Sequence, residues 1–350
     1  MDKPKFRSFA EEQAVNISEN ATLDVTTGTM NINNNDTWIG DVLLSQTNGT
    51  INYKGLKNNA VNAKLTATNG NLNILENTLT VAEDSSIGKN VVTKLYADAS
   101  LDITGGTVDF NTPDIWEGTI NLSDGILNYN DLTENGVIKS TGGNLNIQTG
   151  KLNVITSSNI GYDTVIDLNK NAILNLNGGT LSINDNDRLN STITASSGTL
   201  NIKDITIVPD TFSIQDEDNS NVNVNLNNVF ANLAESDSAI NSYNFGVLKS
   251  DETSEFKIDL NHTIPDIDKI YVGRGSSGTI RLTQIGNETL YNFEDTTKEY
   301  KVLYRENDTD NIKLALDNDE QYYNREWVLD DYANNPTNPT EFIISPYIRG

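Results

Sequence analysis

Three carboxylates beside a tryptophan are the residues of this sequence best suited to acid–base chemistry. Asp109, Asp114 and Glu117 surround Trp116 in one short stretch. Two carboxyl groups that converge on one cleft can protonate a glycosidic oxygen and activate the attacking group. A polysaccharide-active enzyme, either a lyase or a glycoside hydrolase, is therefore one candidate function.

Part of this cluster occurs twice. Asp114 and Trp116 align with Asp36 and Trp38, an earlier pair with the same spacing. A feature that is duplicated with the scaffold is expected to serve the scaffold, so we predict no catalytic residues. Trp38 and Trp116 are candidate binding residues whose rings stack on sugars. The competing interpretation is that both fill the corner of a coil, because tryptophan is mostly buried.

Oxygen-rich acidic loops suggest calcium binding as a further chemistry. The candidates are Asp185-Asn-Asp187, Asp216-Glu-Asp218 and Asp308-Thr-Asp310. None of them matches the EF-hand loop or the Gly-Gly-x-Gly-x-Asp repeat. Acidic loop tips are usually only solvated, so we predict neither a metal nor a cofactor.

Two isolated motifs have simpler interpretations than catalysis. Gly273-Arg-Gly-Ser-Ser-Gly278 has the spacing of a dinucleotide-binding fingerprint, but that fingerprint requires a helix next. The strand-like stretch from Thr279 to Ile285 follows it instead, which favours a tight hairpin turn. His262 is the single histidine. Without a second histidine or a nucleophile elbow, we predict a solvated loop residue.

An internal repeat predicts the strands on which these residues lie. Glycine, any residue, an aliphatic, a polar and an apolar residue recur in this order at Gly28, Gly49, Gly70, Gly106, Gly125, Gly143, Gly179 and Gly198. The alternation predicts strands with one buried face. Two or three strands per about 18–21 residues predict the coils of a right-handed parallel β-helix.

Two intervals between these glycines are longer than the rest. Those from Gly70 to Gly106 and from Gly143 to Gly179 are each about twice the length of a coil. We interpret each long interval as two coils, divided at a degenerate motif. The predicted divisions are Gly88 and Gly161.

Stacked coils place equivalent residues above one another at the strand spacing of about 4.8 Å. Aliphatic residues then line the interior, and the polar residues of the motif form outer ladders in which amides can hydrogen-bond. The predicted outer positions are Asn31, Asn52, Asn73, Asp109, Asn128 and Asn146.

A longer period and a change of composition organise the chain. Leu23 recurs as Leu101, and Leu101 recurs as Leu174, which predicts duplicated blocks of four coils. After Val208 the repeat fades. We predict an N-terminal cap at 1–19, regular solenoid repeats at 20–208, irregular β coils or a capping segment at 209–316, and an acidic loop-rich tail at 317–350.

The composition excludes several classes of protein. With 24 Lys+Arg against 49 Asp+Glu, the formal net charge of −25 repels nucleic-acid phosphates and anionic membranes. The absence of cysteine excludes disulfides and cysteine nucleophiles. Residues 1–13 contain no apolar signal-peptide segment, and no apolar run is long enough for a transmembrane helix.

The glycine-rich units also carry a resemblance. Gly142-Gly-Asn-Leu-Asn-Ile147 and Gly178-Gly-Thr-Leu-Ser-Ile183 resemble repeats in the passenger domains of bacterial autotransporter adhesins and related β-helical surface proteins. The resemblance covers about residues 20–208 and implies export, an extended parallel β-helix and a role in adhesion or aggregation.

We therefore expect a non-catalytic, extracellular protein of the bacterial cell surface, acting in adhesion or as a structural stalk. The expected partners are host or bacterial surface glycans or proteins, with self-association as a further option and no nucleic acid. A polysaccharide-active enzyme on the same fold and a phage-associated fibre are the alternatives.

Overall fold

The computed structural model confirms the all-β class of the chain: over the residues that it describes, the chain is a parallel β-solenoid of about 11 turns. The structure describes residues 14–57, 61–214, 221–234, 241–258, 260–261, 266–285, 300–305, 311–316, 325–329 and 341–348. Its contacts divide into two compact units. The first comprises Met1–Asn175 and Asn186–Ser191, and the second comprises Leu176–Asp185 and Thr192–Gly350.

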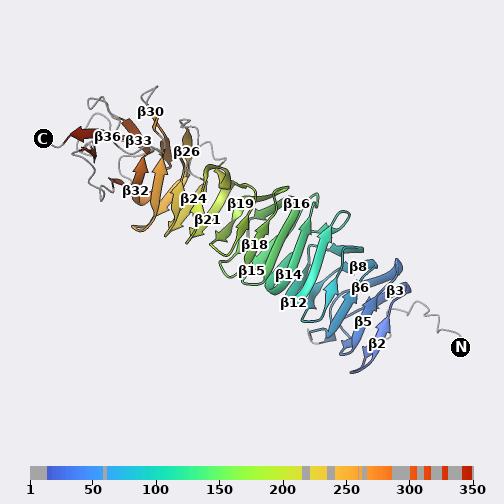
Figure 1. Cartoon of the computed structure of the whole chain (residues 1–350). Coiled ribbons are helices and arrows are strands. Elements are labelled where there is room, and N and C mark those ends of the chain that lie inside the picture. The colour runs from blue at the N-terminus through green and yellow to red at the C-terminus, as the bar shows by residue number, and fades with distance from the viewer. Residues whose placement is uncertain are drawn as a thin grey trace. The chain divides into compact units, whose positions relative to one another are not determined.

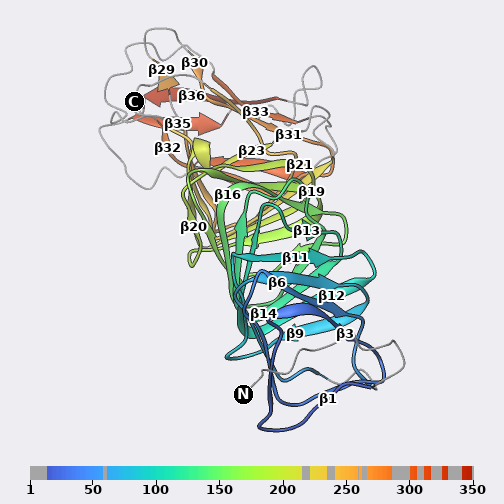
Figure 2. The same cartoon turned by 90° about the vertical axis from the view of Figure 1, so that its right-hand side faces the viewer.

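The coils of the first unit have three faces (Figure 1). The first face contains β2 (Thr22–Asp24), β5 (Asp41–Leu44), β7 (Lys64–Ala67) and β10 (Ser86–Ile87). The second is a five-stranded parallel sheet of β3 (Thr27–Ile32), β6 (Asn48–Tyr53), β8 (Gly70–Ile74), β11 (Val91–Leu95) and β13 (Ile115–Trp116). Figure 2 shows β3, β6, β11 and β13 in succession. The third face begins with β9 (Asn77–Val81).

Longer strands then bend from the third face into the first. The N-terminal half of β12 (Ala99–Asn111) pairs with β9, and its C-terminal half pairs with β10. The same holds for β14 (Thr119–Asn130), which pairs with β15 (Val137–Ser140) and then with β16 (Asn144–Ile155). These two strands therefore each contribute to two faces of the solenoid.

Alternation of side chains builds the core, as the sequence predicts. Along β6 and β8 every second residue is buried, and the residues between them are half-buried on the outside. Ile51, Leu72 and Leu101 are at most 1% exposed. Since a single coil cannot enclose its own apolar residues, the buried columns require neighbouring coils above and below.

The repeated motif does not stay on one face, contrary to the sequence-based expectation. In the first unit it leads into the second face at Gly28, Gly49 and Gly70 but into the first face at Gly106, Gly125 and Gly143. On the second face, Gly70 pairs with Val91, and Gly88 lies in the corner before that strand. The interval from Gly70 to Gly106 therefore spans two coils less one face, and its predicted division at Gly88 is wrong.

The duplicated blocks change face in the same way. Leu23 lies in β2 on the first face, whereas its counterpart Leu101 lies in the third-face half of β12. The block that begins at Leu23 and ends at Leu101 therefore covers four coils less one face. The predicted duplication of four whole coils is wrong in this respect, although the duplicated residues still enter equivalent strands.

The space at the corners explains why the motif begins with glycine. Gly70 has φ +103°, and a Cβ at this position would lie 2.7 Å from the carbonyl oxygen of Gly49. Side chains rarely adopt that backbone conformation. At Gly88 a Cβ would be 3.5 Å from the nearest atom, the carbonyl oxygen of Ala67, which is an ordinary contact. Gly88 is thus not equivalent to the motif glycines.

The second unit continues with parallel pairing. One series of paired strands is β21 (Ile193–Lys203), β24 (Val222–Asn227), β27 (Val247–Ser250), β32 (Ser277–Ile285) and β34 (Asn311–Leu316). A second series is β26 (Ser242–Asn244), β31 (Lys269–Val272) and β33 (Tyr300–Arg305). The region expected to hold irregular coils, 209–316, thus contains parallel strands in register.

Antiparallel strands end the second unit. β36 (Glu341–Ile348) pairs antiparallel with β33, and β35 (Arg325–Leu329) pairs antiparallel with β36. Both lie in the region expected to be a loop-rich tail, 317–350. An antiparallel pair covers the edge that a parallel sheet would otherwise leave open to another chain.

The segment Gly273–Gly278 covers a corner of a coil and the first two residues of β32. Residues 273–276 connect β31 to β32, but each of these strands pairs in parallel with strands of other coils. The expected strand on either side is present, and the expected hairpin is wrong because the two strands belong to different sheets.

Candidate functional site

Asp114 is held by the backbone of two coils. Its Oδ1 accepts a hydrogen bond of 2.8 Å from the N–H of Thr93, and its Oδ2 accepts one of 2.8 Å from the N–H of Asn111. The residue is 9% exposed. The pKa of Asp114 is raised from 3.8 to about 6, mainly because burial disfavours the charged form. The two N–H donors oppose this shift, and the charge of Asp109 adds to it.

The structure does not bring the three candidate carboxylates into one cleft. Asp114 faces the interior of its coil, while Asp109 lies on the outside of β12, where its Oδ1 accepts a 2.6 Å hydrogen bond from Asn128. Glu117 is exposed at the next corner. Because acid–base cleavage of a glycoside needs two carboxyl groups facing one bond, this arrangement does not favour hydrolysis here.

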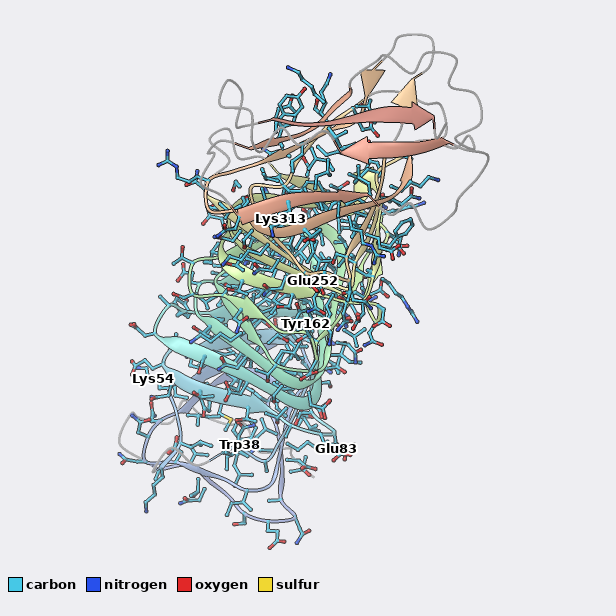
Figure 3. All side chains as sticks on the ribbon, turned by 90° about the vertical axis from the view of Figure 1, so that its left-hand side faces the viewer. Trp38, Lys54, Glu83, Tyr162, Glu252 and Lys313 are labelled. Carbon is cyan, nitrogen blue, oxygen red and sulfur yellow. The ribbon has the colours of Figure 1, made fainter. Side chains whose placement is uncertain are left out.

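Trp38 and Trp116 are buried rather than presented to solvent. They are 3% and 2% exposed, and their indole N–H groups donate to the carbonyl oxygens of Gly40 and Gly118 at 2.9 and 3.0 Å. Trp38 lies within its coil, whereas Lys54 and Glu83 project from the outside of theirs (Figure 3).

Trp116 belongs to an aromatic cluster in the core. Its ring centroid is 5.6 Å from that of Phe110 and 6.5 Å from that of Tyr129. A sugar stacks on an exposed ring face, and neither Trp38 nor Trp116 has one. The geometry therefore does not favour sugar binding at these two residues; it fits the alternative that they fill the coil.

Sequence reasoning missed the role of residues that directly precede a strand. At these positions the side-chain oxygen of a buried or half-buried Ser or Asp accepts a hydrogen bond from a backbone N–H of the preceding coil. These residues are Asp36, Ser85, Asp114, Ser158, Asp187, Ser254, Asp268 and Ser276. The signal in the sequence is Ser or Asp two residues before a buried side chain, as in Asp36-Thr-Trp38 and Ser85-Ser-Ile87.

This role also accounts for one calcium candidate. Oδ1 of Asp187 accepts a 2.8 Å hydrogen bond from the N–H of Ile166. The candidates at 216–218 and 308–310, together with His262, lie outside the described residues. In the parts of the chain that the structure describes, no three acidic or histidine side chains gather as a metal-ligand group.

Amide ladders are the dominant polar feature of the outer surface. The predicted hydrogen bonds between stacked amides are confirmed: Asn52 donates to Asn31 at 2.8 Å, and Asn73 donates to Asn52 at 2.7 Å. The six predicted outer positions form two ladders on different faces, because Asp109, Asn128 and Asn146 lie on the first face. Asn146 donates to Asn128 at 2.8 Å.

All these ladders run in the same direction. Each amide N–H donates to the oxygen of the preceding coil, also in the pairs Asn121 to Asp102, Asn175 to Asn153, Asn201 to Ser182, Asn225 to Asn201 and Asn228 to Asp204. Three ladders begin at an aspartate, which only accepts. In three ladders, one of them the Asp102 ladder, the residue in register after the last asparagine is a lysine, which only donates: Lys94 after Asn73, Lys139 after Asn121 and Lys249 after Asn225.

Comparison with known proteins does not indicate a functional site, so the candidate site is chosen from the geometry described above. No protein-family model and no curated protein matches the sequence. Within the described ranges, no helix is both long and apolar enough to cross a membrane. The outer ladders are thus the candidate functional surface, since they are regular, partly solvent-accessible and rich in hydrogen-bonding groups.

Proposed function

We propose that this chain is a non-catalytic protein of the bacterial cell surface or a secreted protein, which binds glycans or proteins in adhesion or serves as a stalk. The observation that carries the proposal is the set of outer amide ladders. They align the same polar group on successive coils and so offer a ligand many equivalent contacts.

The ladders suit binding because their side chains are already ordered. Asn52 both donates to and accepts from its neighbours, so little rotamer freedom remains to be lost when a ligand binds. Neighbouring strands repeat at about 4.8 Å. A rigid surface of this kind provides affinity through many weak hydrogen bonds instead of one deep pocket.

A polysaccharide-active enzyme is the second candidate. The observation that favours it is the pKa of Asp114, which burial raises to about 6, in the range of a general acid. Both oxygens of this carboxyl group accept backbone N–H groups, however, and the side chain is buried. A substrate could reach it only after the coil had opened.

Glycan-panel binding by the purified chain, with new reducing ends measured for every glycan that binds, tests the proposal. We expect binding without release. Release of reducing ends that is lost in Asp114→Asn would overturn the proposal in favour of the enzyme. A complete lack of binding would remove the glycan-adhesion role and leave stalk or protein-binding roles, which binding assays with surface proteins then test.

A further inference from the structure

One part of the outer surface carries no charge. On the second face, strands β3, β6 and β8 direct six side chains outward in two columns. Register pairing gives one column of Thr29, Thr50 and Asn71, and another of Asn31, Asn52 and Asn73. All six are exposed or half-buried. We call this surface the neutral grid; it lies on a chain whose formal net charge is −25.

Buried core residues beneath the neutral grid and hydrogen bonds within it hold its side chains in place. Ile51 and Leu72, which lie between its two columns on the inner side, are at most 1% exposed. The hydroxyl of the buried Tyr53 donates a 2.7 Å hydrogen bond to the carbonyl oxygen of Thr78. The ladder bonds of 2.8 and 2.7 Å fix Asn52 in one orientation.

The grid retains hydrogen-bonding capacity for a ligand. An asparagine amide has two N–H donors and an oxygen with two lone pairs. Asn52 uses one donor toward Asn31 and one lone pair toward Asn73. One donor and one acceptor therefore remain, beside the hydroxyl of Thr50, which can also do both. A sugar hydroxyl likewise donates and accepts, so the grid and a polyhydroxylated ligand are complementary.

The charge of a polyhydroxylated ligand should decide whether it binds to the grid. None of the six grid residues is a cation that could pair with the carboxylates or sulfates of an acidic polysaccharide, and the negative field of the chain repels polyanions. The exposed Lys54, two residues beyond Asn52, lies at the edge of the grid. The six grid residues also include no carboxylate for a basic polymer. Two other ladders of the first unit differ, because the first-face ladder begins at Asp109 and the third-face ladder runs from Asp102 toward Lys139.

We infer that the neutral grid is a binding site for an uncharged polysaccharide lying across strands β3, β6 and β8. This inference rests on the proposed function and deepens it, because it names the ligand class and the residues. Adjacent rows are about 4.8 Å apart, and alternate residues along a strand are about 6.6 Å apart. Contacts thus repeat in both directions, and two lysines bound the neutral surface: Lys94 in the next coil and Lys54 directly after β6.

The second unit repeats the same chemistry. On β21 and β24, Thr199 pairs with Asn223, and Asn201 pairs with Asn225. Asn225 donates to Asn201 at 2.7 Å. A second neutral grid of this kind offers the same class of ligand a second site, so removal of one site alone is expected to leave partial binding.

The test introduces charge into the grid without removing a ladder asparagine. The first-site variant combines Thr50→Glu with Asn71→Glu, and the double-site variant adds Thr199→Glu and Asn223→Glu. The matched control combines Thr66→Glu with Ser86→Glu, which are paired, half-buried and outward-facing on the first face. Each protein is titrated with dextran, mannan and microcrystalline cellulose as neutral probes, and with polygalacturonate as an acidic one.

We expect wild type and control to bind at least one neutral probe with affinities within about twofold, and to bind polygalacturonate at least tenfold more weakly. The first-site variant should lose several-fold in apparent affinity, and the double-site variant at least tenfold. Circular dichroism and thermal unfolding identify any variant that fails to fold, and Thr50→Ala with Asn71→Ala then replaces the first-site variant.

Two results overturn this inference. If the folded double-site variant keeps wild-type affinity for a neutral probe, the ligand binds elsewhere, although adhesion to glycans as a function stands. If wild type prefers polygalacturonate or binds no neutral probe, the ligand class is wrong. In the latter case, binding to other glycans or proteins in the wider panel still supports the proposed function, and binding to none of them counts against both.

Discussion

The backbone N–H of Thr93 donates a 2.8 Å hydrogen bond to Oδ1 of Asp114, which lies one coil further along the chain. This bond connects two coils through a carboxyl group that is largely removed from water. Asp114 therefore acts as a structural residue whose protonation affects stability, and the same contact explains why an acidic residue occurs in the core.

Asp114 should make the stability of the first unit depend on pH. Its pKa rises from 3.8 to about 6 on burial, so the folded state holds the proton more tightly than the unfolded state. This contribution to stability is present below pH 3.8 and is lost as pH rises through about 6. We expect Asp114→Asn to remove this fall in stability.

Denaturant unfolding at intervals from pH 4 to pH 7 measures the effect. Asp98→Asn removes the same charge from an exposed corner and controls for net charge. If wild type and Asp114→Asn show parallel stability curves over this range, the carboxyl group does not contribute as described. Asn has one oxygen where Asp has two, so Asp114→Asn should also cost about 1–3 kcal/mol at low pH.

Ser85 should be far more important for stability than its neighbour Ser86. The hydroxyl of Ser85 accepts the N–H of Leu65 at 3.2 Å in the core. Ser85→Ala leaves that N–H without its partner and should cost about 1–3 kcal/mol. Ser86 faces outward, and Ser86→Ala should change stability by no more than about 0.5 kcal/mol. Equal losses in thermal unfolding would contradict the role of residues that precede a strand.

Two glycines should respond differently to the addition of one methyl group. Gly70→Ala places Cβ 2.7 Å from the carbonyl oxygen of Gly49 at φ +103°, whereas Gly88→Ala places it 3.5 Å from that of Ala67. We expect a loss of more than about 1 kcal/mol for Gly70→Ala. Gly88→Ala should remain within about 0.5 kcal/mol of wild type. The reverse order in chemical denaturation would show that the corners are packed differently.

Trp116→Phe should separate packing from sugar binding. The change removes the indole N–H bond to Gly118 and part of the contact with Phe110. We expect a loss of about 1–3 kcal/mol in stability. Affinity for a neutral glycan, measured by calorimetry, should remain within about twofold of wild type. A tenfold loss of affinity at unchanged stability would support sugar stacking on this tryptophan.

The fold could be predicted from sequence because its rule is local. Alternation at Met30, Ile51 and Leu72 with asparagine beside them indicates both a strand and its buried face. The hydrogen bonds of the Asn31–Asn52–Asn73 ladder follow from stacking alone. Both inferences need only the alternation and the length of the repeat, which places equivalent residues of successive coils above one another.

The assignment of faces could not be predicted in the same way. Strands on all three faces alternate alike, so a motif that moves from Gly70 on one face to Gly106 on another looks the same in sequence. The role of Asp114 depends on the N–H of Thr93, a contact across 21 residues. The burial of Trp116 likewise results from packing with Tyr129 of the next coil.

Binding of an uncharged polysaccharide by the neutral grid can be observed residue by residue. The most direct measurement is an NMR titration of side-chain amide resonances with whichever soluble neutral probe, dextran or mannan, binds wild type. We predict that the Nδ2 resonances of Asn52 and Asn73 shift at saturation, whereas those of Asn128 and Asn146 on the first face do not. Shifts confined to Asn128 and Asn146, or no shift of any ladder amide at saturation, would contradict the claim.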